Sequence, residues 1–257
     1  MREDIWKGHS SAVWSLSWSP SGGHLATGSS DGTILVQNVE SGAIDVGPIK
    51  TNQGRVCSVA YSPLGDRIAS GGNNNTICFW DSHTGELLVG PITDLGHWVN
   101  AVVWSSDGSK LYSASDEFVH VPNSTASTQL HRFRHNHHLY SIALSPKHNL
   151  LACVGYGGTP QLWDTESRQP FNHPFANKTT RDTLRHVVFS PDGRYLAYCG
   201  DDRKITLWML GDEPAFPAST NLQGGMQQDI LPKSPSSSSL NVSILTFHSS
   251  PYSLPHR

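Results

Sequence analysis

The sequence predicts an all-β fold built from five copies of one four-stranded unit. In each copy a Ser-Pro or Ser-Ser pair closes a short apolar run, and the serines of these pairs stand at positions 19, 62, 105, 145 and 190. Their spacings are therefore 43, 43, 40 and 45 residues. A repeat of about 40–45 residues is typical of β-propeller blades, whereas helical arrays repeat at about 33–34. No segment keeps a helical hydrophobic period over about 12 residues, which also favours strands.

The strands of each unit follow one order along the chain. The first strand is an apolar run of six residues: Val13–Trp18, Val56–Tyr61, Val99–Trp104, Leu139–Leu144 and Leu184–Phe189. The second strand is rich in small residues: Leu25–Ser29, Ile68–Gly72, Leu111–Ser115, Leu151–Gly155 and Leu196–Gly200. The third strand is clearest at Thr33–Val36, Thr76–Trp80 and Ile205–Trp208, and a Ser-Gly or Thr-Gly turn then opens a fourth. Short strands separated by Gly, Asp and Asn turns are typical of antiparallel meanders.

The unit resembles the WD40 repeat. Phe79-Trp80-Asp81 and Leu162-Trp163-Asp164 match the Trp-Asp signature that ends a repeat, and Gly8-His9 matches the Gly-His signature that opens one. With the Ser-Pro-Asp-Gly turn at Ser190–Gly193, the resemblance covers about residues 5–209. The phrases at Val46–Ile49 and Val89–Ile92 resemble repeat arrays of fungal NACHT-type receptors and their stand-alone relatives.

The resemblance implies a side-chain relay in each blade, from the third-strand Trp through a second-strand Ser or Thr and the opening His to a turn Asp. No blade carries all four residue types. Gln37 replaces the Trp of the first blade, Asn52 and Asn74 replace the His and Asp of the second, and Leu95 and Pro122 interrupt the third. Cys153 and Gly157 depart from the pattern in the fourth blade, and Thr180 and Tyr198 in the fifth. Because incomplete buried polar networks and strand prolines such as Pro122 and Pro160 destabilise, we predict a propeller of low stability.

The five repeats do not decide whether the blades close into a ring. The resemblance implies a seven-bladed ring, so the chain is either a shortened or incomplete member of such a lineage, a ring of five, or a fold completed by a second chain. Open blade edges attract further strands, so self-association through them is a further prediction. The domain prediction is a propeller over residues 1–209 and a Ser/Pro-rich disordered tail over 210–257. Within that tail, Asn241–Phe247 is an alternating apolar run that either adds to a blade edge or is incidental.

Composition excludes several functional classes. The net charge of −3, from 18 Lys and Arg against 21 Asp and Glu, disfavours nucleic-acid binding, which needs a basic surplus. No apolar run reaches the length of a membrane helix, and the first residues lack the apolar core of a signal peptide. Four cysteines without a Cys-x-x-Cys pair are predicted to be free and reduced. We therefore expect no membrane association and a cytoplasmic protein, with the nucleus as an alternative.

No catalytic or cofactor motif is present, so the sequence predicts a protein that is not an enzyme and binds no cofactor. The positions expected nearest the propeller axis are mostly small and uncharged: Ser15, Ser58, Ala101, Ser141 and His186. The strongest candidate for a metal site is the run of four histidines between residues 131 and 138. Arg132 and Arg134 within it would repel a cation, and His135 falls at the structural Gly-His position. A solvated turn between blades is therefore the expected structure there.

The resemblance places protein binding on the face where the opening loops emerge. Register positions on that face carry Trp, Tyr and Arg, the residue types enriched in interface hot spots. The predicted binding residues are Trp14, Arg55, Trp98, Asn100, His138, Tyr140, Tyr156, Arg185 and Asp201. The alternative for Trp14 and Trp98 is packing between blades. A hot spot over the third to fifth blades is expected to favour an acidic or aromatic-containing peptide.

The predicted function is a non-enzymatic scaffold or adaptor for a protein or peptide partner. The alternative is a truncated structural fragment of a larger receptor array without binding activity of its own.

Overall fold

The computed structural model describes residues 6–126, 128–135, 137–146, 149–171, 182–210 and 246–248. Within these ranges the chain forms five four-stranded antiparallel sheets and no helix, which confirms the predicted all-β fold. Each sheet is one blade, and its strands pair in sequence order.

The first three blades follow one another without interruption. Blade 1 consists of β1 (Val13–Trp18), β2 (His24–Ser29), β3 (Thr33–Asn38) and β4 (Ile44–Lys50). Blade 2 consists of β5 (Val56–Tyr61), β6 (Arg67–Gly72), β7 (Ile77–Asp81) and β8 (Leu87–Ile92). Blade 3 consists of β9 (Val99–Trp104), β10 (Leu111–Ser115), β11 (Phe118–Pro122) and β12 (Gln129–Arg134). The first strands have the bounds that the apolar runs predict.

The last two blades have short or distant fourth strands. Blade 4 consists of β13 (Leu139–Leu144), β14 (Leu150–Gly155), β15 (Gln161–Asp164) and β16 (Pro170–Phe171). Blade 5 consists of β17 (Leu184–Phe189), β18 (Tyr195–Gly200), β19 (Lys204–Met209) and β20 (Thr246–His248). β20 belongs to the alternating run of the predicted tail and pairs with β19 from Lys204–His248 to Thr206–Thr246. The rest of that tail, 211–245 and 249–257, lies outside the described residues.

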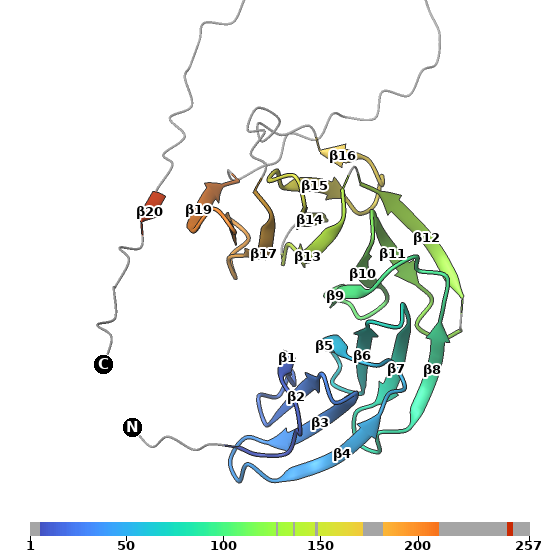
Figure 1. Ribbon diagram of the computed structural model, residues 1–257. Coiled ribbons are helices and arrows are strands. Elements are labelled where there is room, and N and C mark those ends of the chain that lie inside the picture. The colour runs from blue at the N-terminus through green and yellow to red at the C-terminus, as the bar shows by residue number, and fades with distance from the viewer. Residues whose placement is uncertain are drawn as a thin grey trace, which may run out of the picture.

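The blades stand in an open arc with their first strands innermost (Figure 1). Successive inner strands β1, β5, β9, β13 and β17 contact one another. Blade 1, in blue, and blade 5, in orange, stand apart at the two ends of the arc (Figure 1). The five blades therefore do not close into a ring, which removes the alternative of a ring of five.

The core lies between blades and not within them. Between blades 1 and 2, Ile34 and Val36 of β3 pack against Val56 and Val59 of β5. Similar apolar clusters fill the next three junctions. Blade stacking thus buries the two faces that an isolated four-stranded sheet would expose to water.

Serine hydroxyls of the inner strands fasten one blade to the next. The backbone N–H of Val59 donates to Ser15 Oγ over 2.9 Å, and that of Val102 donates to Ser58 Oγ over 3.1 Å. The N–H of Val187 donates in the same way to Ser141 Oγ over 3.3 Å. Three of the small axial residues predicted from the sequence thus bridge neighbouring blades, and Ala101 has no hydroxyl for this purpose at the junction of blades 3 and 4.

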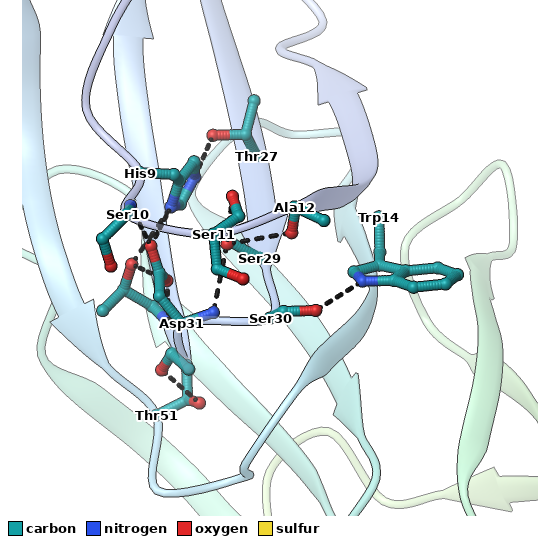
Figure 2. A network of polar contacts seen from close by, with 12 residues as sticks. His9, Ser10, Ser11, Ala12, Trp14, Thr27, Ser29, Ser30, Asp31 and Thr51 are labelled. Atoms are coloured by element: carbon teal, nitrogen blue, oxygen red, sulfur yellow. Dashed lines mark hydrogen bonds and ion pairs between the residues drawn. The ribbon is translucent and has the colours of Figure 1, made fainter.

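The relay of blade 1 contains the three residues that register predicted. His9 Nδ1 donates to Asp31 Oδ2 over 3.1 Å, and His9 Nε2 lies 2.8 Å from Thr27 Oγ1 (Figure 2). Burial alone would raise the pKa of Asp31, but hydrogen bonds from the Thr33 hydroxyl, the Ser10 N–H and His9 outweigh it and hold that pKa well below its usual range. The opening loop is therefore fixed to the turn between β2 and β3.

Blade 2 corrects the register assignment of its His substitute. The relay residue is Gln53 and not Asn52: Trp80 Nε1 donates to Ser70 Oγ over 2.8 Å, and Ser70 Oγ donates to Gln53 Oε1. Gln53 Nε2 continues the relay to Thr76. Asn52 has a φ of 54° and Gly54 a φ of 64°, and the side chain of Gln53, which lies between these two left-handed residues, is buried.

Blades 4 and 5 each lack the usual Ser or Thr of the relay, with different consequences for their buried tryptophans. In blade 5 Trp208 Nε1 donates to the Tyr198 hydroxyl over 3.1 Å, so the phenol replaces the usual Ser or Thr. In blade 4, where Cys153 replaces the Ser or Thr, both Trp163 Nε1 and His135 Nε2 are buried and have no hydrogen-bond partner in the part of the chain that the structure describes. Pro122 is the last residue of β11, and Pro160 immediately precedes the four-residue β15. Both prolines therefore stand at strand ends, where a missing N–H costs little.

Candidate functional site

The candidate site lies where the opening loops meet the starts of the inner strands. In blade 1, Trp14 of β1 donates its indole N–H to Ser30 Oγ over 2.6 Å, and the ring points away from the sheet (Figure 2). Trp14 is 55% exposed. The guanidinium carbon of Arg55, from the loop before β5, lies 4.5 Å from the centroid of that ring. Two predicted binding residues from adjacent blades thus form one cation–π pair.

A second pair of this kind spans blades 4 and 5. The guanidinium carbon of Arg185 on β17 lies 4.9 Å from the ring centroid of Tyr140 on β13. Arg185 Nε and Nη2 donate to the two carboxylate oxygens of Asp201, each over 3.0 Å. This bidentate bond raises the pKa of Arg185 and lowers that of Asp201. Three predicted residues therefore meet in one fixed group.

The predicted His138 contacts a carboxylate that sequence reasoning missed. His138 Nδ1 lies 2.8 Å from Asp116 Oδ1, across the junction of blades 3 and 4. Asp116 is the turn Asp of blade 3, and Leu95 occupies the position of the His that would hold it. The signal was available in the sequence, because a turn Asp without its own His needs another donor.

The remaining predicted residues have separate environments. Trp98 is 42% exposed and tilts against His97, with ring centroids 5.4 Å apart. Asn100 Nδ2 donates to the carbonyl of Leu139 over 2.8 Å, so its amide fastens blade 3 to blade 4. Tyr156 is exposed and meets His137 edge to face at 6.3 Å.

Trp14 and Trp98 are 55% and 42% exposed, and Trp14 also contacts Arg55 of the next blade, so packing between blades stays the alternative to binding for both residues. The structure brings the predicted residues together as pairs over neighbouring blades rather than as one cluster. Trp14 with Arg55 stands at one part of the arc, and Tyr140 with Arg185 and Asp201 at another.

Within the histidine run, His135 is only 3% exposed and packs against Trp163, in agreement with its predicted structural position, so the expected solvated turn does not include it. Burial lowers the pKa of its imidazole to about 4. His131 lies on β12, and His137 and His138 are exposed. Over the residues that the structure describes, no group of three His, Cys, Asp or Glu side chains is arranged to hold a metal ion. All four cysteines are free.

A cleft of about 420 Å³ opens between blades 1 and 2 on the opposite rim. Its polar lining includes His24, Asp45 and Asp66, and Val46 and Tyr61 supply apolar walls. Of the two carboxylates that line the cleft, that of Asp45 already has a partner, because His24 Nε2 lies 3.0 Å from Asp45 Oδ2. None of the predicted binding residues lines this cleft.

Five segments of the chain match the family described as WD domain, G-beta repeat: residues 2–37, 46–81, 90–121, 127–164 and 175–209. Together these matches cover more than half of the chain, and each contains the first strand of one of the five blades. The chain belongs to the WD40 repeat family. Each WD40 match includes the inner strand of its blade, so the family assignment and the fold rest on the same repeats.

Similarity to individual proteins covers a smaller part of the WD40 array. Protein HIR1 of Gibberella zeae is 38% identical over 90 residues, which are 32% of this chain and 8% of that protein. Protein HIR1 of Chaetomium globosum is 33% identical over 90 residues, with the same coverage. Protein hir-1 of Neurospora crassa is 35% identical over 92 residues, 32% of this chain and 9% of the relative. The alignments thus span less than a tenth of these relatives.

The resemblance to NACHT-type receptor arrays is not shown by these relatives and stays a prediction.

Among the described residues there is no helix with the length and apolarity needed to span a bilayer.

Proposed function

We propose that this WD40 protein is a non-enzymatic scaffold that binds a protein or peptide on the face of the opening loops. The observation that carries the proposal is the pairing of Tyr140 with Arg185 across blades 4 and 5. Aromatic rings give a large contact area at low rotamer entropy, and Asp201 holds the Arg185 guanidinium in a fixed position beside the ring. Membership in the WD40 family supports the general role, and the names of the HIR1 relatives specify no partner for this chain.

The experiment compares partner recovery by two double variants of the whole chain. Recovery from native lysate should fall at least about ten-fold for Tyr140→Ala with Arg185→Ala, since truncating a central anchor typically costs about 2 kcal/mol or more. The matched control on the opposite rim is Asp66→Ala with Asp107→Ala, and circular dichroism checks that both variants fold. If the control alone loses the partner, binding belongs to the cleft that Asp66 lines. If wild type recovers only chaperones, the alternative of a structural fragment without binding activity is favoured.

A second candidate function is association through the ends of the arc. On blade 1, the leading face, defined by Val13, Leu16 and Trp18, is 51–61% exposed. The equivalent Val56 and Val59 of blade 2 are 0% and 4% exposed, because blade 1 covers them. An apolar surface of this kind marks an interaction site.

The trailing face of blade 5 is uncovered in the same way. It is defined by Val188, Ile205 and Met209, which are 44%, 56% and 60% exposed, whereas Ile34, the blade 1 equivalent of Ile205, is fully buried. The two end faces therefore correspond to the two surfaces that meet at every interior junction. This correspondence supports the predicted self-association through open blade ends.

Complementation tests this second candidate. Leu16→Asp removes the leading face and Ile205→Asp the trailing face, so each variant alone should sediment as a monomer. An equimolar mixture should form a 1:1 dimer through the one intact pair of faces. The control Leu64→Asp changes a turn residue that is 80% exposed and should leave the wild-type association constant unchanged. A wild-type chain that stays monomeric at the highest soluble concentration contradicts the proposal.

Absence of nucleic-acid and membrane partners, absence of catalysis, and a cytoplasmic location stay predictions from the sequence.

A further inference from the structure

Arg55 is half-buried, and its guanidinium stacks on the Trp14 ring on the face of the opening loops. Its position over Trp14 is fixed from below by the 2.6 Å hydrogen bond that holds the indole to Ser30. Its backbone is fixed as well, because the Arg55 N–H donates to Asn73 Oδ1 over 3.0 Å and the Asn73 N–H donates back to the Arg55 carbonyl. The guanidinium is thus held in place before any ligand arrives.

The donors of this guanidinium have no acceptor among the described residues. The guanidinium groups of Arg67, Arg185 and Arg194 all hydrogen-bond within the chain, and those of Arg185 and Arg194 do so to carboxylates. For Arg55 the stacking contact with Trp14 is the side-chain interaction that the described part of the chain provides. An Arg with free, directed donors in a fixed fork is suited to a planar carboxylate.

Blades 4 and 5 contain a related arrangement in which the guanidinium is already paired, although Arg185 is the second residue of β17 whereas Arg55 precedes β5. In blades 4 and 5, Tyr140 stands at the register position of Trp14, and the stacked Arg185 takes the carboxylate of Asp201 in bidentate fashion. Asp201 and Asn73 are equivalent, since each donates its N–H to the carbonyl of the loop before the inner strand. Blade 2 therefore has a neutral amide where blade 5 has the carboxylate.

We propose that Arg55 and Trp14 bind the side-chain carboxylate of an Asp or Glu in an acidic peptide. The carboxylate of the peptide pairs with Arg55 as Asp201 pairs with Arg185, and the indole ring packs against the neighbouring apolar atoms of the peptide. A single guanidinium can hold one planar carboxylate through two parallel hydrogen bonds. The loops around Arg55 carry Asn52, Asn73 and Asn74 and so add neutral polar groups. This inference deepens the proposed scaffold function by placing its acid-binding position at blades 1 and 2.

The test follows the indole N–H resonance of Trp14 during titration with a hexaglutamate peptide. A Trp14→Phe variant assigns the resonance among the eight tryptophans. In wild type the resonance should shift saturably. With Arg55→Gln the apparent dissociation constant should rise at least about ten-fold, and Arg55→Lys should recover only part of the affinity because an ammonium is not bidentate.

Asn73→Asp is the decisive variant, since it keeps the guanidinium and copies the carboxylate of blade 5. A carboxylate at position 73, whose side chain already accepts the Arg55 N–H, should offset the positive charge of Arg55 and weaken hexaglutamate binding. The control Arg194→Gln removes an exposed cation on the opposite rim, one that already has Asp192 as partner, and should change nothing.

Equal binding by wild type, Arg55→Gln and Asn73→Asp overturns the inference. A saturable shift with inorganic phosphate at lower concentration than with hexaglutamate also overturns it in favour of a phosphate site. Failure here is distinct from failure of the scaffold function, because a partner that binds through Tyr140 and Arg185 would still be recovered by the Arg55→Gln chain.

Discussion

Trp80 donates its indole N–H to Ser70 Oγ over 2.8 Å, and both side chains are buried within blade 2. The Ser70 hydroxyl in turn donates to Gln53 Oε1, and this bond joins the second strand to the opening loop. This bond is the link that blade 4 lacks, where Cys153 stands in the same register against Trp163. The contrast between these two blades leads to specific predictions on stability.

Ser70→Ala should lower the free energy of unfolding by about 1–3 kcal/mol. The substitution leaves the Trp80 N–H and the Gln53 carbonyl oxygen buried without their shared partner, and an unsatisfied buried group carries its full desolvation cost. Denaturant unfolding measures the effect. Ser106→Ala, at an exposed serine of a turn, should change stability by less than about 0.5 kcal/mol. Equal effects of the two substitutions would contradict the relay.

Cys153→Ser should raise stability, by about 1 kcal/mol. The new hydroxyl stands between Trp163 Nε1 and His135 Nε2, two buried atoms that have no partner. The matched control is Cys78→Ser in blade 2, where the thiol packs in an apolar cluster and a hydroxyl gains nothing. Thermal unfolding of the two variants should therefore shift in opposite directions, and a loss of stability for both would refute the proposed role of Cys153.

Ala101→Ser should add a hydrogen bond at the junction of blades 3 and 4. The serines at three other junctions accept the N–H of the next inner strand, and Ile142 stands at the matching position of blade 4. A net gain of about 0.5–1.5 kcal/mol is expected from one such bond. Ala69→Ser, which buries a hydroxyl in the apolar cluster of blade 2, should instead destabilise the fold. Chemical denaturation of both variants checks the prediction.

Stability should fall as the pH drops from about 6.5 to about 4. Burial lowers the pKa of His135 from 6.5 to about 4 in the folded chain, so the unfolded chain binds the proton first across this window. The loss amounts to about 3 kcal/mol at full extent and levels off below pH 4. Urea unfolding at a series of pH values from 7.5 to 4.5 measures the slope.

His135→Gln should flatten that slope whether or not the variant is less stable than wild type. The control His83→Gln changes a side chain that is 78% exposed and should leave the slope of stability against pH unchanged. A wild-type slope that persists in the His135→Gln chain would assign the pH dependence to other groups.

The sequence by itself determined the five repeats, the bounds of the inner strands and the small residues of the axis. These features depend on the alternation of apolar side chains along a strand and on turn residues nearby in the chain, both of which are local. The same local pattern placed His9, Thr27 and Asp31 in one relay. It also predicted which residues lie on the opening-loop face, but not which of them contact one another.

Only the tertiary structure decided which of those residues meet. The choice of Gln53 over Asn52 depends on two left-handed backbone residues in one loop, which no apolar period specifies. The contacts of Arg55 with Trp14 and of His138 with Asp116 join blades that are distant in sequence, and their geometry depends on how neighbouring sheets stack and twist. The open arc is decided at the same level, because whether Leu16 and Ile205 are covered depends on which blade stands beside them and not on the residues that flank them in the chain.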